Sequence, residues 1–308
     1  MPQPHLETAT EAAKGGFNAG ETILGHVSDS SIEHPLIHLP KVLGVDMSVT
    51  KHVFMLWFGA AVVLLLVTVS VRRYLRQDRK VPTGFAGLLE YIALFVRDEI
   101  VEPNVGRKWV NTWTPLLLTF FLFILGINLI GLVPLGDTLA LLNHTVIHPA
   151  EGSFLERLPH GGSTPTGNFN VTAALATISF FAIILAGTLA HGFVKHWKNL
   201  VPSGVPKAIY PLLIPIEIIG MFVRPFALTM RLAANMTGGH IAILAIISFV
   251  FLFAEMTGSA MVGVGIGVPS LVMASLISVL EVIVALVQAY VFTLLTAVFV
   301  GMAIHAHH

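Results

Sequence analysis

Long apolar runs separated by short polar segments make up most of this chain. Three of the runs, residues 53–71, 113–135 and 169–194, contain no Asp, Glu, Lys or Arg. Each has at least 19 residues, and about 20 helical residues rise far enough to cross the roughly 30 Å hydrocarbon core of a bilayer. The pattern therefore predicts three membrane-spanning helices before residue 195.

The last hundred residues are apolar over two longer stretches, 206–256 and 268–304. As straight helices they would extend about 76 and 55 Å at 1.5 Å per residue, so they must tilt or bend. The segment between them, residues 257–267, is rich in glycine, which favours a turn. The two stretches therefore predict a long, tilted helical hairpin.

A shorter amphipathic helix is predicted over residues 83–101. Leu88, Ile92, Val96 and Ile100 recur every four positions and share one helical face. A helix with one apolar face can lie in the membrane interface, and the alternative is a linker helix that faces water. We therefore expect an all-α polytopic membrane protein, with about five spanning segments plus this interfacial helix.

The composition agrees with this class. Hydrophobic residues make up 55% of the chain and charged residues 11%, with a mean hydropathy of +0.82, too apolar for a soluble domain of this length. Lys plus Arg and Asp plus Glu both number 17, so the net charge indicates no nucleic-acid partner. The chain has no cysteine, which excludes disulfides and thiol chemistry.

Basic residues follow the first and third apolar runs. Five of residues 72–80 are Arg or Lys, and Lys195 and Lys198 follow the third run. The positive-inside rule places these ends in the cytoplasm, with the N-terminus outside and the C-terminus inside. We expect residues 1–50 to form a polar external segment and residues 51–308 to form a single transmembrane domain.

Polar residues interrupt the first arm of the hairpin at regular positions. Glu217, Arg224 and Arg231 are seven residues apart and therefore share one helical face. Asn235, four residues after Arg231, lies on that face too. His240 is nine residues from Arg231, which turns it to the opposite side of the helix.

The second arm carries matching polar positions. Glu281 and Gln288 are again seven residues apart. In an antiparallel hairpin, residues at one depth are equally far from the turn. His240 paired with Glu281, and Arg231 paired with Gln288, both place the turn near residue 260, inside the glycine-rich segment. The polar residues are therefore predicted to form two rungs at membrane depth.

Arg231 is the residue that points most directly to a function. A charged side chain at bilayer depth costs roughly 3 kcal/mol on insertion scales, so it normally faces a protein partner or a water-filled cavity. Its guanidinium stays protonated at any working pH. A permanent cation close along the chain to the titratable His240 indicates a path for ions.

Two other classes of membrane protein fit the sequence less well. A secondary transporter would show repeated halves with broken helices at matching positions, whereas here the charges gather in one terminal hairpin. An intramembrane hydrolase would need a pattern such as H-E-x-x-H or G-x-S-x-G, which the chain lacks. A nucleotide-binding G-x-x-x-x-G-K-[ST] loop is also missing, so nucleotide chemistry must reside on other subunits.

Three segments carry a family resemblance. They are Arg224–His240 (RPFALTMRLAANMTGGH), Leu280–Phe292 (LEVIVALVQAYVF) and Asn128–Pro134 (NLIGLVP). They closely resemble subunit a of the F-type ATP synthase, and the resemblance covers roughly residues 50–304. The family's function would make the chain a proton-translocating stator subunit, which couples proton flow to rotation and ATP synthesis.

The resemblance also implies partners. The chain would lie in the bilayer beside a rotating ring of c subunits, each with a carboxylate at mid-membrane, and would contact the peripheral-stalk b subunits and the rest of the complex. It would make no bonds itself, and we expect no cofactor or metal. The ring, in another chain, would decide between H⁺ and Na⁺. We expect a bacterial inner membrane, with the mitochondrial inner membrane as the alternative.

Individual residues take their expected roles from the family's motifs. Arg231 matches the essential arginine, whose charge favours the ionised form of a nearby carboxylate and separates two aqueous half-channels. His240 and Glu281 match the polar pair of the outer half-channel, in the reverse order to some bacterial members. Asn235 and Gln288 match residues beside the arginine.

The remaining polar positions are less specific. Asn128 matches a residue that faces the inlet channel, and Glu217 matches an acid near the inner exit. Arg224 either modulates the path or only pairs with Glu217. For Asn128 and Asn235 the alternative is a structural hydrogen bond between helices. Gly131 stands where several bacterial relatives carry an acid, so we assign it no role.

Overall fold

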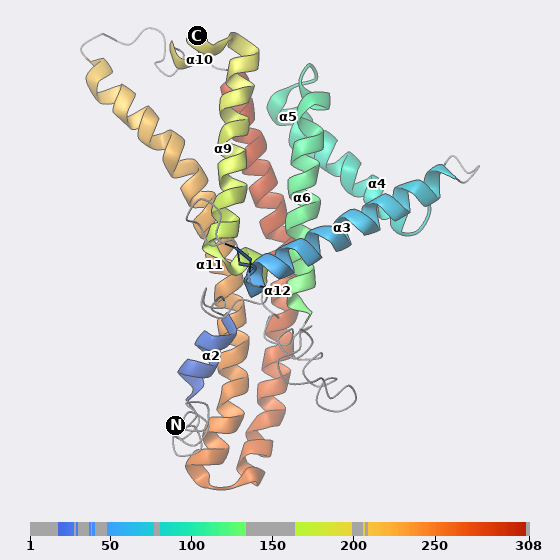
Figure 1. Cartoon of the computed structure of the whole chain (residues 1–308), viewed down its shortest axis with the longest axis vertical. Helices are drawn as coiled ribbons and strands as arrows, with labels where there is room; N and C mark the ends of the chain where they lie inside the picture. The colour runs from blue at the N-terminus through green and yellow to red at the C-terminus, as the bar shows by residue number, and fades with distance from the viewer. Residues whose placement is uncertain are drawn as a thin grey trace. The chain divides into compact units, whose positions relative to one another are not determined.

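Helices are the regular elements of the computed structural model, which describes residues 18–27, 29, 37, 39–40, 48–76, 81–133, 164–198, 206 and 209–305. In these ranges the only β-type pairing is an isolated antiparallel bridge between Ile37 and Val49. Five of the described helices are long and apolar enough to cross a membrane (Figure 1): α3 (Lys51–Leu75), α6 (Val110–Leu132), α9 (Phe169–His191), α11 (Tyr210–Thr257) and α12 (Ala260–Ile304). The predicted all-α polytopic class is confirmed.

The ends of the spanning helices follow local backbone constraints. The run predicted over 113–135 stops earlier, at Leu132, because Val133 is extended (φ −78°, ψ 123°), as the residue before a proline prefers to be. The run predicted over 169–194 is broken at Gly192, whose φ of +84° ends α9. The short helix α10 (Phe193–Lys198) then carries the basic residues.

The amphipathic helix predicted over 83–101 forms three consecutive pieces. They are α4 (Phe85–Phe95), the π-helix η1 (Val96–Val101) and α5 (Glu102–Val105). A π-helix has more residues per turn than an α-helix, so apolar residues four or five apart stay on one face. Val96, Ile100, Val101 and Val105 are fully buried. The end of this helix therefore packs into the core instead of facing water.

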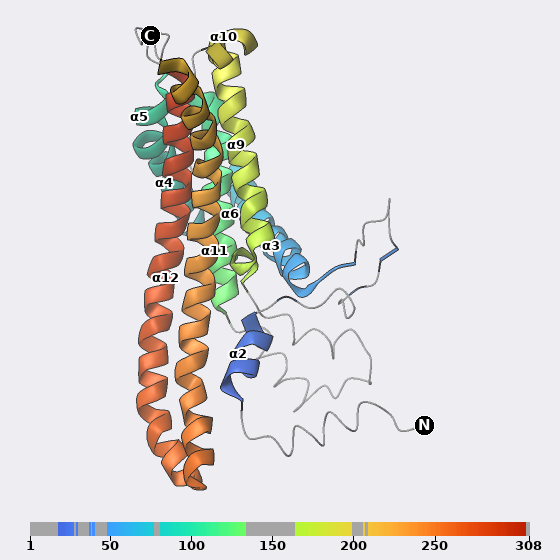
Figure 2. The ribbon, with the colours of Figure 1, turned by 90° about the vertical axis from the view of Figure 1, so that its left-hand side faces the viewer.

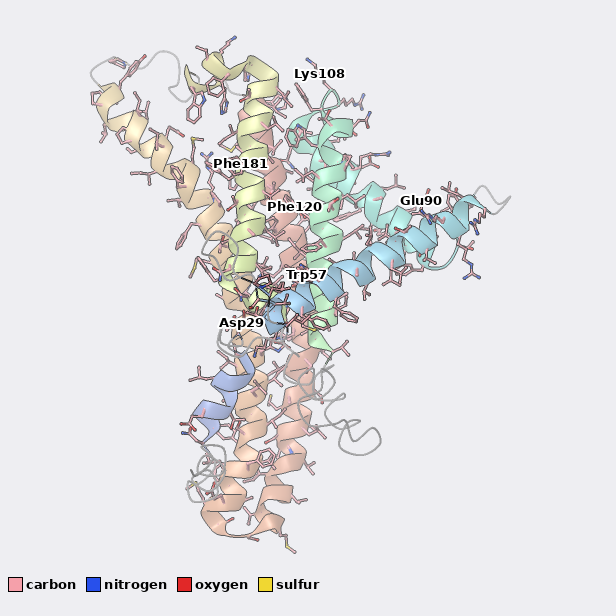
Figure 3. The ribbon with its side chains drawn as sticks, viewed as in Figure 1. Asp29, Trp57, Glu90, Lys108, Phe120 and Phe181 are labelled. Atoms are coloured by element: carbon pink, nitrogen blue, oxygen red, sulfur yellow. The ribbon has the colours of Figure 1, made fainter. Side chains whose placement is uncertain are left out.

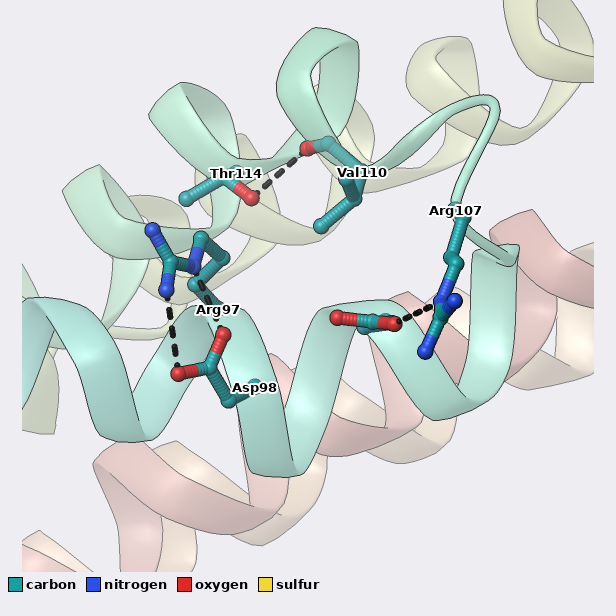
Figure 4. A network of polar contacts seen from close by, with 6 residues as sticks. Arg97, Asp98, Arg107, Val110 and Thr114 are labelled. Atoms are coloured by element: carbon teal, nitrogen blue, oxygen red, sulfur yellow. Dashed lines mark hydrogen bonds and ion pairs between the residues drawn. The ribbon is translucent and has the colours of Figure 1, made fainter.

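The outer side of the same segment carries local ion pairs (Figure 4). Arg97 Nε donates to Asp98 Oδ1 at 2.6 Å and Arg107 Nε donates to Glu102 Oε1 at 2.9 Å. The hydrogen bond from Arg97 holds the pKa of the Asp98 carboxyl below its usual value. Both pairs lie at the surface, where ion pairs contribute little to stability.

The chain divides into two compact units, and α11 and α12 each contribute to both. The described part of the first unit includes α2 (Ala19–Val27) and the hairpin tip, residues 235–283. The second contains residues 53–133, 164–234 and 284–308. The prediction of one transmembrane domain over 51–308 stays a prediction.

The second unit is a helical bundle in which α6 and α9 lie beside the C-terminal part of α12 (Figures 1 and 2). Phe120 of α6 is buried, and its ring packs edge to face on that of Phe292 of α12 with the ring centroids 5.4 Å apart. Trp57 and Phe181, in contrast, are exposed (Figure 3). Small residues let the helices approach closely. In the C-terminal part of α12, five small residues are fully buried: Ala285, Ala289, Thr293, Thr296 and Ala297.

The tip of the hairpin belongs to the first unit. Gly258, with φ +60°, and Ser259 are its only non-helical residues, so the turn is much shorter than the predicted segment 257–267. Residues 260–267 continue as helix despite their glycines, because a helix satisfies the backbone hydrogen bonds of an apolar membrane segment internally. Gly263 packs closely against Ala254, where an added Cβ would lie 2.7 Å from the alanine methyl. The predicted antiparallel hairpin is present, and its turn at residues 258–259 lies one to two residues before the position predicted from the pairings.

Candidate functional site

Arg231 lies near the middle of α11, and its side chain is exposed. Leu228, Leu232 and Met236 are buried on the adjoining face of the helix, so the arginine stands at the edge of the packed surface. Its guanidinium makes no hydrogen bond or ion pair with any other residue that the structure describes. Asn235, one turn further on, is exposed as well. The structure thus presents an uncompensated cation on the outside of a membrane-spanning helix.

The polar residues of α12 have the opposite environment. Glu281 and Gln288 are 6% and 5% exposed. Within the hairpin tip, the Glu281 carboxylate packs directly on Gly239, so closely that any side chain at that position would collide with it. Glu281 Oε1 has no hydrogen-bond partner among the described residues. His240, next to Gly239, is half-buried.

The predicted rungs are therefore only partly visible as contacts. Glu281 lies against the neighbour of His240, close to the depth that the spacing predicts. Arg231 and Gln288 are not joined by a hydrogen bond in the described structure, and the arginine is exposed while the glutamine is buried. Sequence spacing gives depth along a helix but cannot tell whether a side chain points inward or outward.

Asn128 is fully buried near the end of α6. Its Oδ1 accepts a 2.6 Å hydrogen bond from Thr166 Oγ1, while its Nδ2 has no partner among the described residues. Thr166 belongs to the short 3₁₀ turn η4 (Pro165–Gly167) that leads into α9. The sequence analysis missed this threonine, because it lies 38 positions from Asn128 and only the fold brings them together.

Gly131 completes this buried corner. A Cβ at this position would lie between 2.5 and 2.7 Å from the side-chain atoms of Thr164. An acidic side chain at this position would therefore need Thr164 and its turn to move. Glycine is the residue that the observed packing requires.

Arg224 and Glu217 are both half-buried on α11. The Arg224 guanidinium lies 5.3 Å from the ring centroid of Phe299 on α12, in a cation–π contact. No ion pair links Arg224 to Glu217 among the residues described. The pairing considered from the sequence is thus replaced by a contact with an aromatic ring.

The chemistry that this arrangement supports is proton transfer and electrostatics. The described residues contain no group of three His, Cys, Asp or Glu side chains that could hold a metal ion. The polar side chains instead follow the two long helices, with the Glu281 carboxylate and the His240 imidazole in the hairpin tip and the exposed Arg231 nine residues before His240 on α11.

Comparison with known proteins identifies the family. The family described as "ATP synthase A chain" matches residues 53–301, most of the chain. The chain belongs to this family. An ATP synthase subunit a 2 from Prosthecochloris aestuarii is 37% identical over 97% of this chain and 84% of its own length. Subunits a from Pelodictyon phaeoclathratiforme and Chlorobium phaeobacteroides are each 37% identical, over 97% and 99% of this chain and 81% and 80% of their own lengths.

Membership of the ATP synthase A chain family confirms the resemblance that the three motifs carry. The chain is a membrane-embedded, proton-translocating stator subunit of the F-type ATP synthase complex, and it does not itself catalyse bond formation. All eight polar residues singled out from the sequence lie inside the matched region. Their individual roles are a separate question.

Proposed function

We propose that the exposed face of α11 around Arg231 lies against the c-ring. The observation that carries the proposal is the exposed guanidinium, which has no partner within the described chain although it sits mid-way along a spanning helix. A cation at that depth needs a counter-charge or water. A carboxylate on each passing ring helix supplies the counter-charge, and Arg231 favours its ionised form so that its proton leaves.

The outer half-channel delivers protons through His240 and Glu281. Both residues can bind and release a proton, and Glu281 lies within the hairpin tip on the face of Gly239. One carboxylate oxygen has no protein hydrogen bond in the described structure, which leaves it available to a water molecule. Asn128, with an unpaired buried Nδ2, binds water on the inlet side.

The inner half-channel begins on the other side of Arg231. Glu217 stands fourteen residues before Arg231 on the same helix, about 21 Å along its axis at 1.5 Å per residue, and provides an acid near the inner exit. Arg224 lies between them and keeps its position by contact with Phe299. Asn235 and Gln288 flank Arg231 and fix the water around it. The fixed positive charge prevents protons from passing between the half-channels unless the ring turns.

The position of basic residues sets the orientation in the membrane. The ends of α3 and α9 are followed by Arg and Lys, so these ends face the cytoplasm of a bacterial inner membrane. The C-terminus then lies in the cytoplasm and the N-terminal segment outside. The c-ring covers the Arg231 face, and peripheral-stalk b subunits hold the stator from the side.

The test is ATP-driven proton pumping in inverted membrane vesicles that carry the complex with Arg231→Ala. We expect pumping to disappear while the complex still assembles and its ATP hydrolysis remains measurable. Arg73→Ala, which removes an exposed arginine at the end of α3, is the control and should retain pumping. Pumping at the wild-type rate in Arg231→Ala would show that the charge is structural and would overturn the proposal.

A further inference from the structure

A surface pocket lies in the second unit, at the end of the bundle opposite to Asn128. Its volume is about 400 Å³, and its walls come from the α5–α6 turn and the C-terminal ends of α9 and α12. Three spanning helices end here, so the pocket lies at the depth of the lipid headgroups and not in the hydrocarbon core. The proton path does not use it.

The charged side chains lining this pocket are all basic. Arg107 and Lys108 project from the α5–α6 turn, and the remaining titratable residues of the lining are His191 and His305. Glu102 pairs with Arg107 but uses only Nε of the guanidinium, so both terminal nitrogens stay free to bind another acceptor (Figure 4). Lys108 has no carboxylate partner within the described chain. The pocket therefore has two fixed positive charges, Arg107 and Lys108, and only one of them is paired with a carboxylate, that of Glu102.

The backbone around the pocket is compatible with an anion. The N–H groups of Val110, Thr112 and Trp113 at the start of α6 already bond to carbonyls of the preceding turn, so only the positive end of the helix dipole favours an anion beside Arg107 and Lys108. The carbonyl ends of α9 and α12 would repel an anion, but histidines cover part of them. His191 Nε2 donates to the Ile304 oxygen at 2.9 Å and His305 Nδ1 donates to the Gly301 oxygen at 3.1 Å.

Aromatic residues define where this pocket lies relative to the bilayer. Trp109 lines the pocket, and the Lys108 amine sits 5.4 Å from the centroid of its ring. Trp197, on α10 just after the end of α9, is exposed. Tryptophan beside lysine or arginine is typical of the membrane–water interface. A ligand with an anionic head and an apolar body fits such a place better than a free soluble anion.

We propose that this pocket binds the phosphodiester headgroup of an anionic phospholipid. Arg107 and Lys108 bind the phosphate oxygens, the arginine through two parallel hydrogen bonds, and the partly exposed Trp109 contacts the glycerol and the first acyl carbons. Basic pockets between spanning helices on the cytoplasmic side have the chemistry that recognises such headgroups. The bound lipid ties the ends of α6, α9 and α12 together.

The test uses the intact, purified complex and a photoreactive phosphatidylglycerol. After delipidation, the complex is mixed with the probe, irradiated, and labelled peptides of this chain are mapped by mass spectrometry. We expect labelling of the peptide around residues 105–109, and unlabelled phosphatidylglycerol should compete with it. Phosphatidylcholine and free inorganic phosphate should not. Equal competition by phosphatidylcholine, or protection by inorganic phosphate, would overturn the assignment to an anionic lipid.

Variants separate specific binding from general surface charge. Arg107→Gln with Lys108→Gln should lower labelling of this peptide roughly tenfold or more, since each basic residue contributes on the order of a fivefold change in lipid affinity. Arg107→Lys with Lys108→Arg keeps both charges and should retain labelling. Arg72→Gln with Arg73→Gln, an exposed pair at the end of α3, removes equal charge and should leave labelling unchanged. Reduced labelling in the Arg72/Arg73 control, or unchanged labelling in the Arg107→Gln and Lys108→Gln variant, would contradict the proposal.

Discussion

The two long helices carry polar residues at similar depth but expose them differently. On α11 the side chains of Arg231 and Asn235 are exposed. On α12 Glu281 and Gln288 are 6% and 5% exposed. Both helices are apolar enough to cross a membrane, so apolar composition alone does not explain the difference.

The difference follows from the residues between the polar positions. On α12, Ala285 and Ala289 are fully buried, and such small residues let other helices approach and enclose the polar side chains. On α11, Phe226 and Met230 point outward with 57% and 43% of their surface exposed, which is suited to contact with lipid or another subunit. This difference in exposure supports the proposal that Glu281 and Gln288 act inside the chain and that Arg231 and Asn235 act on a partner.

The largest effect is expected on the buried arm. Glu281→Ala removes the carboxylate of the proposed outer half-channel, and the loss of one proton-transfer group slows transfer on the order of 100-fold. ATP-driven pumping in inverted vesicles measures it. Leu280→Ala, next to it and 56% exposed, should pump normally. Pumping within a few-fold of wild type in Glu281→Ala would remove Glu281 from the path.

A pair of adjacent glycines on α11 sharpens the comparison further. Gly239→Ala forces a methyl group into the Glu281 carboxylate, whereas Gly238 has open space around it. Overpacking of this kind costs about 1–3 kcal/mol, so Gly239→Ala should lower the temperature at which the purified complex dissociates. Gly238→Ala should not lower it. Identical behaviour of the two variants would mean that Glu281 does not pack on this face.

Thr166→Val extends the comparison to the buried amide of α6. The valine keeps the shape but leaves Asn128 Oδ1 without its 2.6 Å donor, and an unpaired buried acceptor costs about 1 kcal/mol. We expect a small drop in the thermal stability of the complex and slower pumping. Thr166→Ser retains the hydroxyl and should behave as wild type. A fully stable valine variant would argue that water replaces the lost bond.

The smallest effect contrasts one residue from each arm. Gln288→Met keeps the volume of a buried side chain but removes an amide that has no hydrogen bond to another described residue, so the thermal stability of the detergent-solubilised subunit should rise slightly. Asn235→Leu on the exposed face should leave the thermal stability of the detergent-solubilised subunit unchanged while it slows pumping in the assembled complex. A change of stability in Asn235→Leu together with none in Gln288→Met would contradict the assignment of Gln288 to a buried face and of Asn235 to an exposed face.

Much of the fold is predictable because membrane insertion imposes a simple rule. Long uncharged runs must be helices, and all five predicted spans correspond to described helices. The predicted helix ends are less accurate than the spans themselves, because each end depends on a single residue, such as Gly192 after α9 or the extended Val133 after α6. The predicted turn is too broad, because the glycines at 263, 265 and 267 favour a loop in the sequence but lie within α12, where Gly263 packs closely on Ala254.

The candidate site was predictable in its residues but not in its contacts. Arg231 and Glu281 are visible in the sequence as charges in apolar surroundings, and regular spacing gives their depth. Asn128 has Thr166 as its hydrogen-bond partner and Arg224 lies against Phe299, and both contacts depend on how separate helices pack. Their residue types carry no signal of that role. Spacing also could not show that Glu281 packs on Gly239.

The most direct test of the central claim asks what covers the Arg231 face. The chain has no native cysteine, so single cysteines can be placed at Ala234, which is exposed, or at its neighbour Ala233, which is 8% exposed. A second cysteine is placed on the c subunit one helical turn from its membrane carboxylate. We expect oxidation to cross-link Ala234→Cys to the ring and to leave Ala233→Cys uncross-linked. Cross-linking of Ala233→Cys alone, or of neither variant in an assembled complex, would contradict the placement of Arg231 against the ring.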